Sequence, residues 1–572
     1  MMRRQFELRV GMSSQPRFFA TSKRGLEVLQ DPLLNKGSAF TLAEREMLDL
    51  QGHLPPHVST PEEQLQRAYA AVTSSDDPLE RYVELLALQD RNEHLYYRLL
   101  TENMAEFMPI VYTPTVGLAC ERYSHVFQRA RGVWIDPSMR GNMANVLQKL
   151  KIDHPVRLIV ATDNESILGI GDQGAGGMAI SVGKLALYVA GAGLHPGETL
   201  PVSLDVGTNN QALLDDDLYL GWRHRRLEGD DYISFIDEFV EAVCKVFPGT
   251  LLQWEDFRKD NAVSILARHR STLLSFNDDV QGTGAVTLAG IYSALKISGA
   301  QWSEQRVVIH GAGAAGAGIA NQIRVAMRMA GLSDADVQER IAILDSRGLL
   351  VDDQEIRDSY KLDLAWPLEV ASRHGLADPT QRDLESVVDA YKPTILIGSS
   401  GQPGAFTEEI VRSLLDNCER PIVLPFSNPT SLSEAKPEDV IRWTDGRALV
   451  ATGSPFAPVE FNGKTFVIGQ GNNVFIFPGL GLGALLAKSV SVTDEMVTVA
   501  AQACAEAMTD EELAKGMLYP AIERLRSVSA HVARNVAMAA VDQGISNVHP
   551  DQIDASLADD LWDPHYPEIT IE

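Results

Sequence analysis

A glycine-rich segment near the middle of the chain constrains the fold more than any other feature. GAGAAG at residues 311–316 follows the apolar run RVVIH at 306–310 and precedes a helical pattern over 319–329. A strand, a tight glycine turn and a helix in this order are typical of the first unit of a dinucleotide-binding fold. The first two glycines would let the backbone approach a pyrophosphate, and Gly316 would let the helix pack closely against the strand.

The carboxylate at the end of the next predicted strand indicates which coenzyme the fold would bind. Asp345 follows the run 341–344 and could accept hydrogen bonds from an adenosine ribose, which favours NAD over NADP. Arg347 and Lys361 lie close by in sequence and could offset the repulsion of a 2′-phosphate, so NADP is possible. Because glycine-rich turns are common, a purely structural βα turn with a capping aspartate is the alternative interpretation.

Chain length and the alternation of patterns predict the architecture. The 572 residues are too many for one core. Strand and helix signals alternate in two regions, which predicts an α/β protein with a Rossmann-type dinucleotide-binding domain, a second α/β domain and a helical N-terminal domain. The expected domains are a helical one over 1–130, a substrate and metal domain over 131–277 completed by 468–540, a Rossmann-type domain over 278–467, and a tail over 541–572.

Individual elements follow from the same patterns. Strands are expected at 156–161, 200–206, 306–310, 341–344, 394–397 and 421–424, and helices within 40–103, 183–192, 319–329, 500–508 and 531–540.

Charge and cysteine usage exclude several classes of function. The 50 basic and 77 acidic side chains give a net charge of −27, which disfavours nucleic acid and anionic membranes as partners. A small anionic substrate would need a local positive field from a metal, a lysine or a helix N-terminus. Four scattered cysteines without a CxxC pair, and no apolar run long enough to span a bilayer, predict a cytoplasmic enzyme.

Two pairs of adjacent carboxylates stand among apolar and aromatic residues. They are Glu255-Asp256 in WEDF and Asp278-Asp279 in FNDDVQGTG. Oxygen ligands without nearby His or Cys suit Mg²⁺ or Mn²⁺. Acidic pairs more often cap helices or face solvent, but an unpaired charge in apolar surroundings is costly. Both interpretations stay open at this point.

A tyrosine and a lysine are further candidates. Tyr112 lies between Pro109 and Pro114, which restrict its backbone, and Lys184 interrupts the apolar segment SVGKLAL. A lysine on such a face usually extends to solvent, whereas a buried one would give up its proton readily and could act as a base. A single tyrosine in an apolar stretch is more often part of the core.

Many segments together resemble one enzyme family. PIVYTPTVGLAC, ILGIGDQGAGGM, VGKLALY, LDVGTNN, WEDF, FNDDVQGT, GAGAAGAGIA, SNPT, GSPF and GQGNNVFIFPG are similar to motifs of the malic enzymes, in the same order and over nearly the whole chain. The resemblance implies oxidative decarboxylation of malate to pyruvate with a nicotinamide dinucleotide and Mg²⁺ or Mn²⁺. It also implies a homodimer or homotetramer.

The resemblance further implies roles for single residues. Tyr112 matches the general acid, Lys184 the general base and Asp278 a carboxylate that supports the lysine. Glu255, Asp256 and Asp279 match the metal ligands. Gly311, Gly313, Ala314, Ala315, Gly316, Asp345, Asn428 and Asp279 match the coenzyme site, and Asn428, Asn472 and Asn473 match groups that touch substrate or nicotinamide.

One position departs from the family pattern. Ser166, in DNESILG, stands where typical malic enzymes carry an arginine that binds a malate carboxylate. Loss of one charge-assisted contact could cost about 1.5–3 kcal/mol of binding. Three hypotheses follow. The first is an oxidative malic enzyme in which another cation replaces this arginine, and the overall likeness favours it. The second is a malolactic-type enzyme, because malolactic enzymes have a small residue here, keep NAD bound and release lactate. The third is a regulatory dinucleotide-binding protein, and the retained Tyr112, Lys184 and three metal ligands speak against it.

Overall fold

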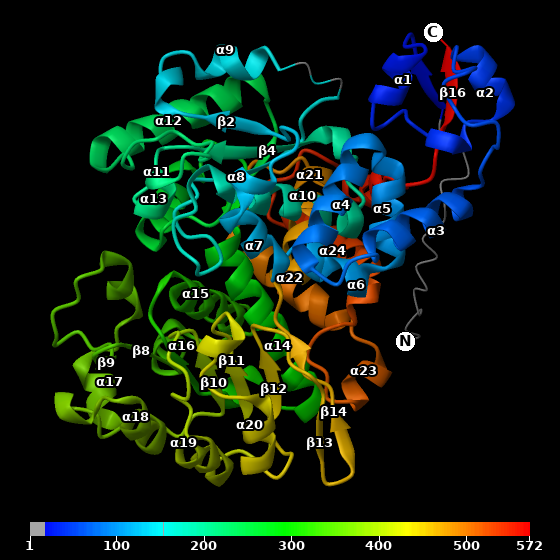
Figure 1. Ribbon diagram of the computed structural model, residues 1–572. Coiled ribbons are helices and arrows are strands. Elements are labelled where there is room, and N and C mark those ends of the chain that lie inside the picture. The colour runs from blue at the N-terminus through cyan, green and yellow to red at the C-terminus, as the bar shows by residue number, and fades with distance from the viewer. Residues whose placement is uncertain (1–17, 151, 153, 572) are drawn as a thin grey trace. The chain divides into compact units, whose positions relative to one another are not determined.

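The computed structural model describes residues 18–150, 152 and 154–571. The chain forms two compact units, one of Met1–Phe257 with His549–Glu572 and the other of Arg258–Val548. Figure 1 follows both units along the chain by colour. Each unit is described by itself below.

The first unit begins with short helices. Capping residues explain where the two longest of these helices start. Thr60 and Glu63 form a capping box at the start of the helix that begins at Pro61, and Asp77 caps the helix that begins at Pro78. The helices are α1 (Leu26–Gln30), α2 (Leu42–Met47), α3 (Pro61–Val72), α4 (Pro78–Arg91), α5 (Glu93–Glu102), α6 (Met104–Val111), α7 (Thr115–Glu121) and α8 (Tyr123–Val126). These elements confirm the predicted helical N-terminal region.

A parallel sheet forms the centre of the first unit. Strands β2 (Val133–Ile135), β4 (Thr199–Leu204), β3 (Leu158–Thr162) and β5 (Leu251–Trp254) lie in that order, with β3 hydrogen-bonded to both β4 and β5. Helices α9 (Met143–Gln148), α10 (Met178–Ala192), α11 (Gln211–Asp215) and α12 (Gly229–Val246) belong to the same unit. The terminal strands β1 (Phe18–Thr21) and β16 (Glu568–Ile571) pair in parallel, and α25 (Ile553–Asp560) precedes β16.

Helix α10 is the buried core helix of this sheet. All of its residues, Met178–Ala192, are buried, including Lys184. The expectation that no apolar run could span a bilayer does not hold for the segment Gly174–Ala192, which is long and apolar enough by length and composition alone. The most apolar stretch of this segment is, however, 94% buried inside the protein. Burial of that kind is what a core helix packed on a sheet requires.

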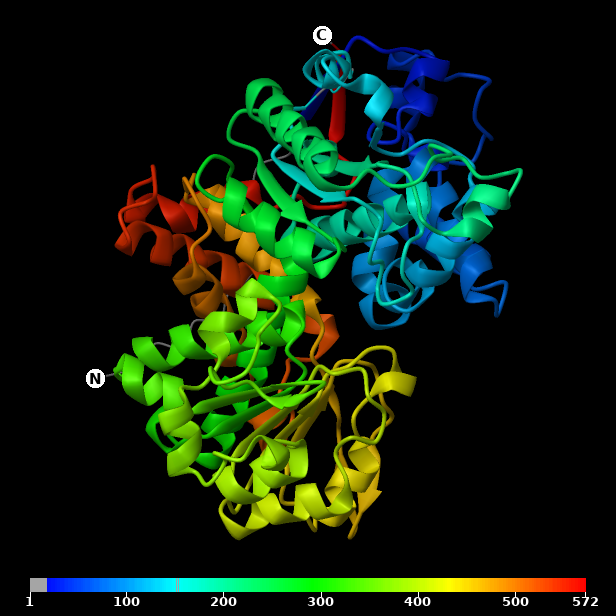
Figure 2. The same cartoon turned by 90° about the vertical axis from the view of Figure 1, so that its left-hand side faces the viewer.

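The second unit contains the predicted dinucleotide sheet (Figure 2). Its strand order is β15 (Gly469–Gln470), β12 (Leu449–Thr452), β11 (Ile422–Pro425), β10 (Ile395–Gly398), β7 (Val307–His310), β8 (Ile341–Asp345) and β9 (Gly348–Leu349). All neighbouring strands are parallel except β8 and β9. The order reverses at β7, where a doubly wound sheet binds its ligand. The Rossmann-type prediction is confirmed.

Helices connect and cover these strands. They are α15 (Ala314–Met329), α16 (Asp334–Glu339), α17 (Leu368–Arg373), α18 (Leu384–Tyr391), α19 (Glu408–Ser413) and α20 (Pro437–Trp443). The hairpin of β13 (Val459–Phe461) and β14 (Lys464–Phe466) projects from the unit (Figure 1). Helix α15 begins at Ala314, earlier than its apolar pattern from 319 predicts, because the pattern starts only after the small residues of its first turn.

The compact units divide the chain differently from the expected domains. Segment 258–277, with α13 (Lys259–His269) and β6 (Ser275–Asn277), groups with the dinucleotide sheet, and so does 468–540. The reason is packing: α14 (Thr283–Ser298) contacts α15 and α22 (Asp494–Glu506), and α22 contacts α24 (Leu525–Asp542). Helix α24 also packs against α21 (Phe477–Leu486), and α23 (Asp510–Ala514) lies nearby.

Candidate active site

A buried lysine and a buried tyrosine lie together in the first unit. Tyr112 follows the last residue of α6, and the residue is 5% exposed. The Lys184 Nζ lies 5.1 Å from the centre of the Tyr112 ring. Gly183 makes this approach possible, because a Cβ at that position would lie 2.6 Å from the Val111 carbonyl oxygen.

The lysine forms an ion pair with one of the predicted metal ligands. Lys184 Nζ lies 2.9 Å from Glu255 Oε1, and the two side chains are 1% and 2% exposed. Glu255 follows β5, so the end of this strand carries its carboxylate toward α10. The structure thus excludes the interpretation of Lys184 as a surface residue. A buried charge of this kind is tolerated only when it is paired.

Two polar residues that the sequence analysis missed extend this contact. Gln253 donates from Nε2 to Glu255 Oε2 at 2.7 Å, and Tyr188 donates its hydroxyl to Gln253 Oε1 at 2.5 Å. Tyr188 lies one helical turn beyond Lys184 on α10. The sequence did offer one signal for this contact, the single glutamine in the apolar strand LLQW. A buried amide needs hydrogen-bond partners, so Gln253 could have been expected to bind a polar group of the site.

Asp256 is held by its backbone and by a neighbouring loop. Its φ of 55° lies in the left-handed region, which aspartate tolerates better than most residues. The Ser166 N–H donates to the Asp256 carbonyl at 3.0 Å, and the Leu168 N–H donates to Asp256 Oδ2 at 3.3 Å. The loop that carries the departure from the family pattern therefore contacts a predicted metal ligand.

The other predicted acidic pair lies in the second unit. Asp278 and Asp279 begin the helical turn Asp278–Gly282 directly after β6. Asp278 is fully buried, and Asn473 donates from Nδ2 to Asp278 Oδ2 at 3.0 Å. Two predicted site residues from distant parts of the sequence are thus brought together. The Asn472 side chain accepts from the Val474 N–H at 3.0 Å and so caps the next turn.

The glycine-rich loop has the geometry that a dinucleotide requires. Gly311 has φ of 120°, and a Cβ there would meet the Ser399 backbone at 2.5 Å. A Cβ at Gly316 would lie 1.8 Å from the Gly311 carbonyl oxygen, whereas Gly313 faces open space with nothing within 4 Å. Gly313 also immediately precedes α15, where the helix N-terminus favours negative charge.

The open space at Gly313 predicts how a methyl group at this position would affect stability and coenzyme binding. Gly313→Ala should leave the free energy of unfolding within about 0.5 kcal/mol of the wild type, because no protein atom opposes the new Cβ. The KM for NAD should rise about 10-fold, since an unrelieved steric conflict with the coenzyme costs roughly 1–3 kcal/mol. Urea unfolding and initial-rate kinetics check both parts. An unchanged KM for NAD would contradict the placement of the pyrophosphate here.

Asp345 lies at the end of β8 between two cations. Its Oδ2 is 3.4 Å from Lys361 Nζ and 3.7 Å from Arg347 Nη2, and its side chain is 10% exposed. The cations that the sequence placed nearby are therefore paired with Asp345. This pairing leaves the carboxylate in place as a partner for a ribose hydroxyl.

Asn428 is hydrogen-bonded to Ser454, and the residue before it, Ser427, binds a buried carboxylate that the sequence analysis did not single out. Its Oδ1 accepts from Ser454 Oγ at 2.6 Å, and its neighbour Ser427 donates to Glu434 Oε1 at 2.5 Å. The fully buried Glu434 also accepts from the Ser400 N–H at 2.8 Å. Glu434 thus joins the loops that follow β10 and β11. Its position in sequence, beyond SNPT in a polar stretch, gave no signal of burial.

A glycine loop on a doubly wound sheet, and a buried lysine–carboxylate pair beside a tyrosine, define a dinucleotide-dependent α/β enzyme. Comparison with known proteins identifies which one. Residues 89–270 match the family model "Malic enzyme, N-terminal domain" and residues 280–541 match "Malic enzyme, NAD binding domain". The chain belongs to the malic enzyme family.

Curated relatives agree over almost the whole length. The NAD-dependent malic enzyme of Aeromonas hydrophila is 47% identical over 543 residues, which cover 95% of this chain and 96% of the relative. NAD-dependent malic enzyme 3 of Bacillus subtilis is 48% identical over 551 residues, covering 96% and 97%.

Solved structures show the same fold. The malic enzyme of Entamoeba histolytica has a TM-score of 0.55 at 22% identity and covers 90% of this chain and 91% of its own. The malic enzyme of Pyrococcus horikoshii has a TM-score of 0.52 at 22% identity and covers 80% and 89%.

Proposed function

We propose that this enzyme oxidises and decarboxylates (S)-malate to pyruvate and CO₂ with reduction of NAD, in the presence of Mg²⁺ or Mn²⁺. The observation that carries the proposal is the buried Lys184–Glu255 pair beside Tyr112. Relatives named as NAD-dependent malic enzymes support the choice of NAD.

The donor set fits a hard divalent cation. Glu255 and Asp256 are adjacent and buried, and both offer carboxylate oxygens. Together with Asp279 they would hold Mg²⁺ or Mn²⁺, which prefer oxygen ligands. When bound, the ion supplies positive charge that stabilises the C2 oxygen of the substrate as CO₂ departs. Mg²⁺ and Mn²⁺ share this chemistry, so the donor set does not choose between them.

The residues of the chain account for the proton steps. Lys184, buried and held by Glu255, takes the proton of the malate hydroxyl at Nζ while the C2 hydride passes to the nicotinamide. The C3–C4 bond then breaks, and its electron pair stays on the enolate of pyruvate. Tyr112 donates its phenolic proton to C3, which gives the methyl group of pyruvate. Asp278 would support the lysine, and the Asn428, Asn472 and Asn473 side chains would contact substrate or nicotinamide.

Ser166 favours a second candidate function. Ser166 is exposed, and its side chain cannot replace the charge of the family's arginine. A malolactic reaction, in which bound NAD is reduced and reoxidised while malate becomes lactate, is therefore the alternative.

Product analysis separates the two functions. Purified protein is incubated with L-malate, Mn²⁺ and NAD, and NADH, pyruvate and lactate are quantified together. We expect pyruvate and NADH in equal amounts, because the proposed reaction releases both. Lactate without net NADH would establish the malolactic reaction instead, and no turnover would reject both.

We also propose a cytoplasmic homodimer or homotetramer. The four cysteines, all within the described residues, form no disulfide, as expected in a reducing compartment. The malic enzymes are homo-oligomers, and the membership of this chain in that family supports the same kind of assembly. Sedimentation equilibrium would measure the number of subunits directly.

A further inference from the structure

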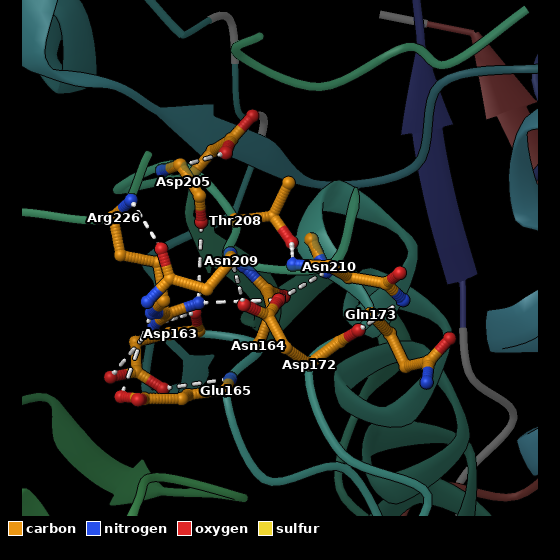
Figure 3. Close-up of polar contacts among 12 residues, drawn as sticks. Asp163, Asn164, Glu165, Asp172, Gln173, Asp205, Thr208, Asn209, Asn210 and Arg226 are labelled. Atoms are coloured by element: carbon orange, nitrogen blue, oxygen red, sulfur yellow. Dashed lines mark hydrogen bonds and ion pairs between the residues drawn. The ribbon is translucent and has the colours of Figure 1, made fainter. Parts of the chain in front are cut away.

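One buried arginine lies at the centre of a polar network beside the candidate site. Arg226 has a 2% exposed side chain and forms ion pairs with Asp163 at 3.3 Å, Glu165 at 3.5 Å and Asp172 at 3.4 Å. Figure 3 shows its side chain among these carboxylates. All four residues belong to the first unit.

The guanidinium also binds backbone oxygens of two loops. Arg226 Nη2 donates to the Asp163 carbonyl at 2.8 Å, and Nη1 donates to the Gly207 carbonyl at 3.2 Å. Asp163 follows β3 and Gly207 follows β4, so one side chain joins the segments beyond two neighbouring strands. Gly207 has φ of 92°, and a Cβ there would meet the His224 carbonyl oxygen at 2.6 Å, so only glycine fits.

The carboxylates around Arg226 are fixed from other sides as well. Tyr232 donates its hydroxyl to Asp163 Oδ2 at 2.6 Å. Asp172 accepts from the Gly174 N–H at 3.0 Å and from the Asn209 N–H at 2.8 Å. The planar guanidinium suits such a site, because its donors reach several acceptors at fixed angles. Both ends of the loop 163–172 are thus tied to Arg226.

The middle of this loop contacts Asp256. Ser166 and Leu168 donate their backbone N–H groups to the Asp256 carbonyl and to its Oδ2. A carboxylate that accepts a backbone hydrogen bond on one oxygen keeps the other oxygen in a defined direction. The position of the Asp256 side chain therefore depends on the loop, and the loop depends on Arg226.

We propose that Arg226 is a positioning residue that sets the metal affinity of this enzyme by holding the loop 163–172 against Asp256. This inference rests on the proposed function, in which Asp256 is a metal ligand. Arg226 does not replace the missing substrate arginine, because its guanidinium is already bound by three carboxylates and two carbonyls.

Binding of Mn²⁺ tests the inference without turnover. Free Mn²⁺ is measured by electron paramagnetic resonance during titration of the whole protein, in the absence of malate and NAD. Arg226→Met should raise the Kd for Mn²⁺ about 10–100-fold, the range typical of residues that orient a metal ligand. Arg226→Lys should give an intermediate Kd, since an ammonium group reaches fewer of the five acceptors.

Matched variants separate positioning from general destabilisation. Arg382 is also buried, at 1% side-chain exposure, and pairs with both oxygens of Asp353 in the second unit. Arg382→Met should lower the melting temperature but leave the Kd for Mn²⁺ at the wild-type value. If Arg226→Met does not fold, Asp172→Asn keeps the acceptor for Gly174, removes one charge from the network, and should raise the Kd about 10-fold.

The outcomes distinguish this inference from the proposed function. A folded Arg226→Met or Asp172→Asn variant with the wild-type Kd for Mn²⁺ would overturn the role of Arg226. Asp256→Asn serves as the reference for ligand loss. If the wild type binds no Mn²⁺, or if Asp256→Asn binds it as tightly as the wild type, the proposed metal site itself is rejected.

Discussion

Replacing Lys184 with alanine should lower kcat for malate oxidation about 10³-fold, because a positioned general base contributes roughly 10²–10⁴ to the rate. Lys184 is the buried amine that contacts Glu255 and faces Tyr112. The KM for NAD should stay unchanged, since the glycine loop is built from other elements. Steady-state kinetics at saturating Mn²⁺ measures both constants.

The chain offers a matched control for this variant. Lys36 and Glu44 form another lysine–glutamate pair in the first unit, with side chains 8% and 12% exposed. Lys36→Ala should lower the free energy of unfolding, because it leaves the largely buried Glu44 carboxylate without its ion-pair partner. The kcat of this variant should stay at the wild-type value. A Lys184→Ala variant with more than a tenth of wild-type kcat would remove Lys184 from the proton transfer.

Replacing Glu255 with glutamine should raise the Kd for Mn²⁺ at least about 100-fold. The amide keeps the shape of the side chain but loses its negative charge, so the effect should exceed the 10–100-fold typical of residues that only orient a ligand. In the wild type, Gln253 Nε2 donates a hydrogen bond to Glu255 Oε2. In one rotamer of the new glutamine, the amide nitrogen would take the place of Oε2 and could not accept this hydrogen bond. Paramagnetic resonance titration measures the Kd, and circular dichroism checks the fold.

Glu434→Gln is the control for loss of a buried carboxylate. Glu434 is fully buried and accepts hydrogen bonds from Ser400 and Ser427, within the second unit. This variant should leave the Kd for Mn²⁺ unchanged. Wild-type Mn²⁺ affinity in a folded Glu255→Gln protein would exclude Glu255 as a ligand.

Local patterns were sufficient to predict the dinucleotide sheet. RVVIH, GAGAAG and the apolar helix after it are contiguous, and each step of strand, turn and helix has its own residue preferences. The strands around 341–344, 394–397 and 421–424 appear within a residue of their expected bounds. Short-range sequence therefore fixes these elements.

Side chains that meet across the fold could not be predicted in the same way. Arg226 lies in the basic run WRHRRL, which reads as a solvated surface, yet three carboxylates from one distant loop surround it. Gln253 and Tyr188 become part of the site only because β5 and α10 lie together. The grouping of 468–540 with the dinucleotide sheet likewise depends on helix packing that no local pattern records.

Chemical rescue of Lys184→Ala tests the central claim most directly. The truncation leaves space beside Glu255, and a small amine such as methylamine can take the place of the lost Nζ. If Lys184 is the base for the malate hydroxyl, kcat should rise with the concentration of free-base amine, and more basic amines of equal size should rescue better. Amine-independent kcat in a folded Lys184→Ala protein that still binds Mn²⁺ and NAD would contradict the account.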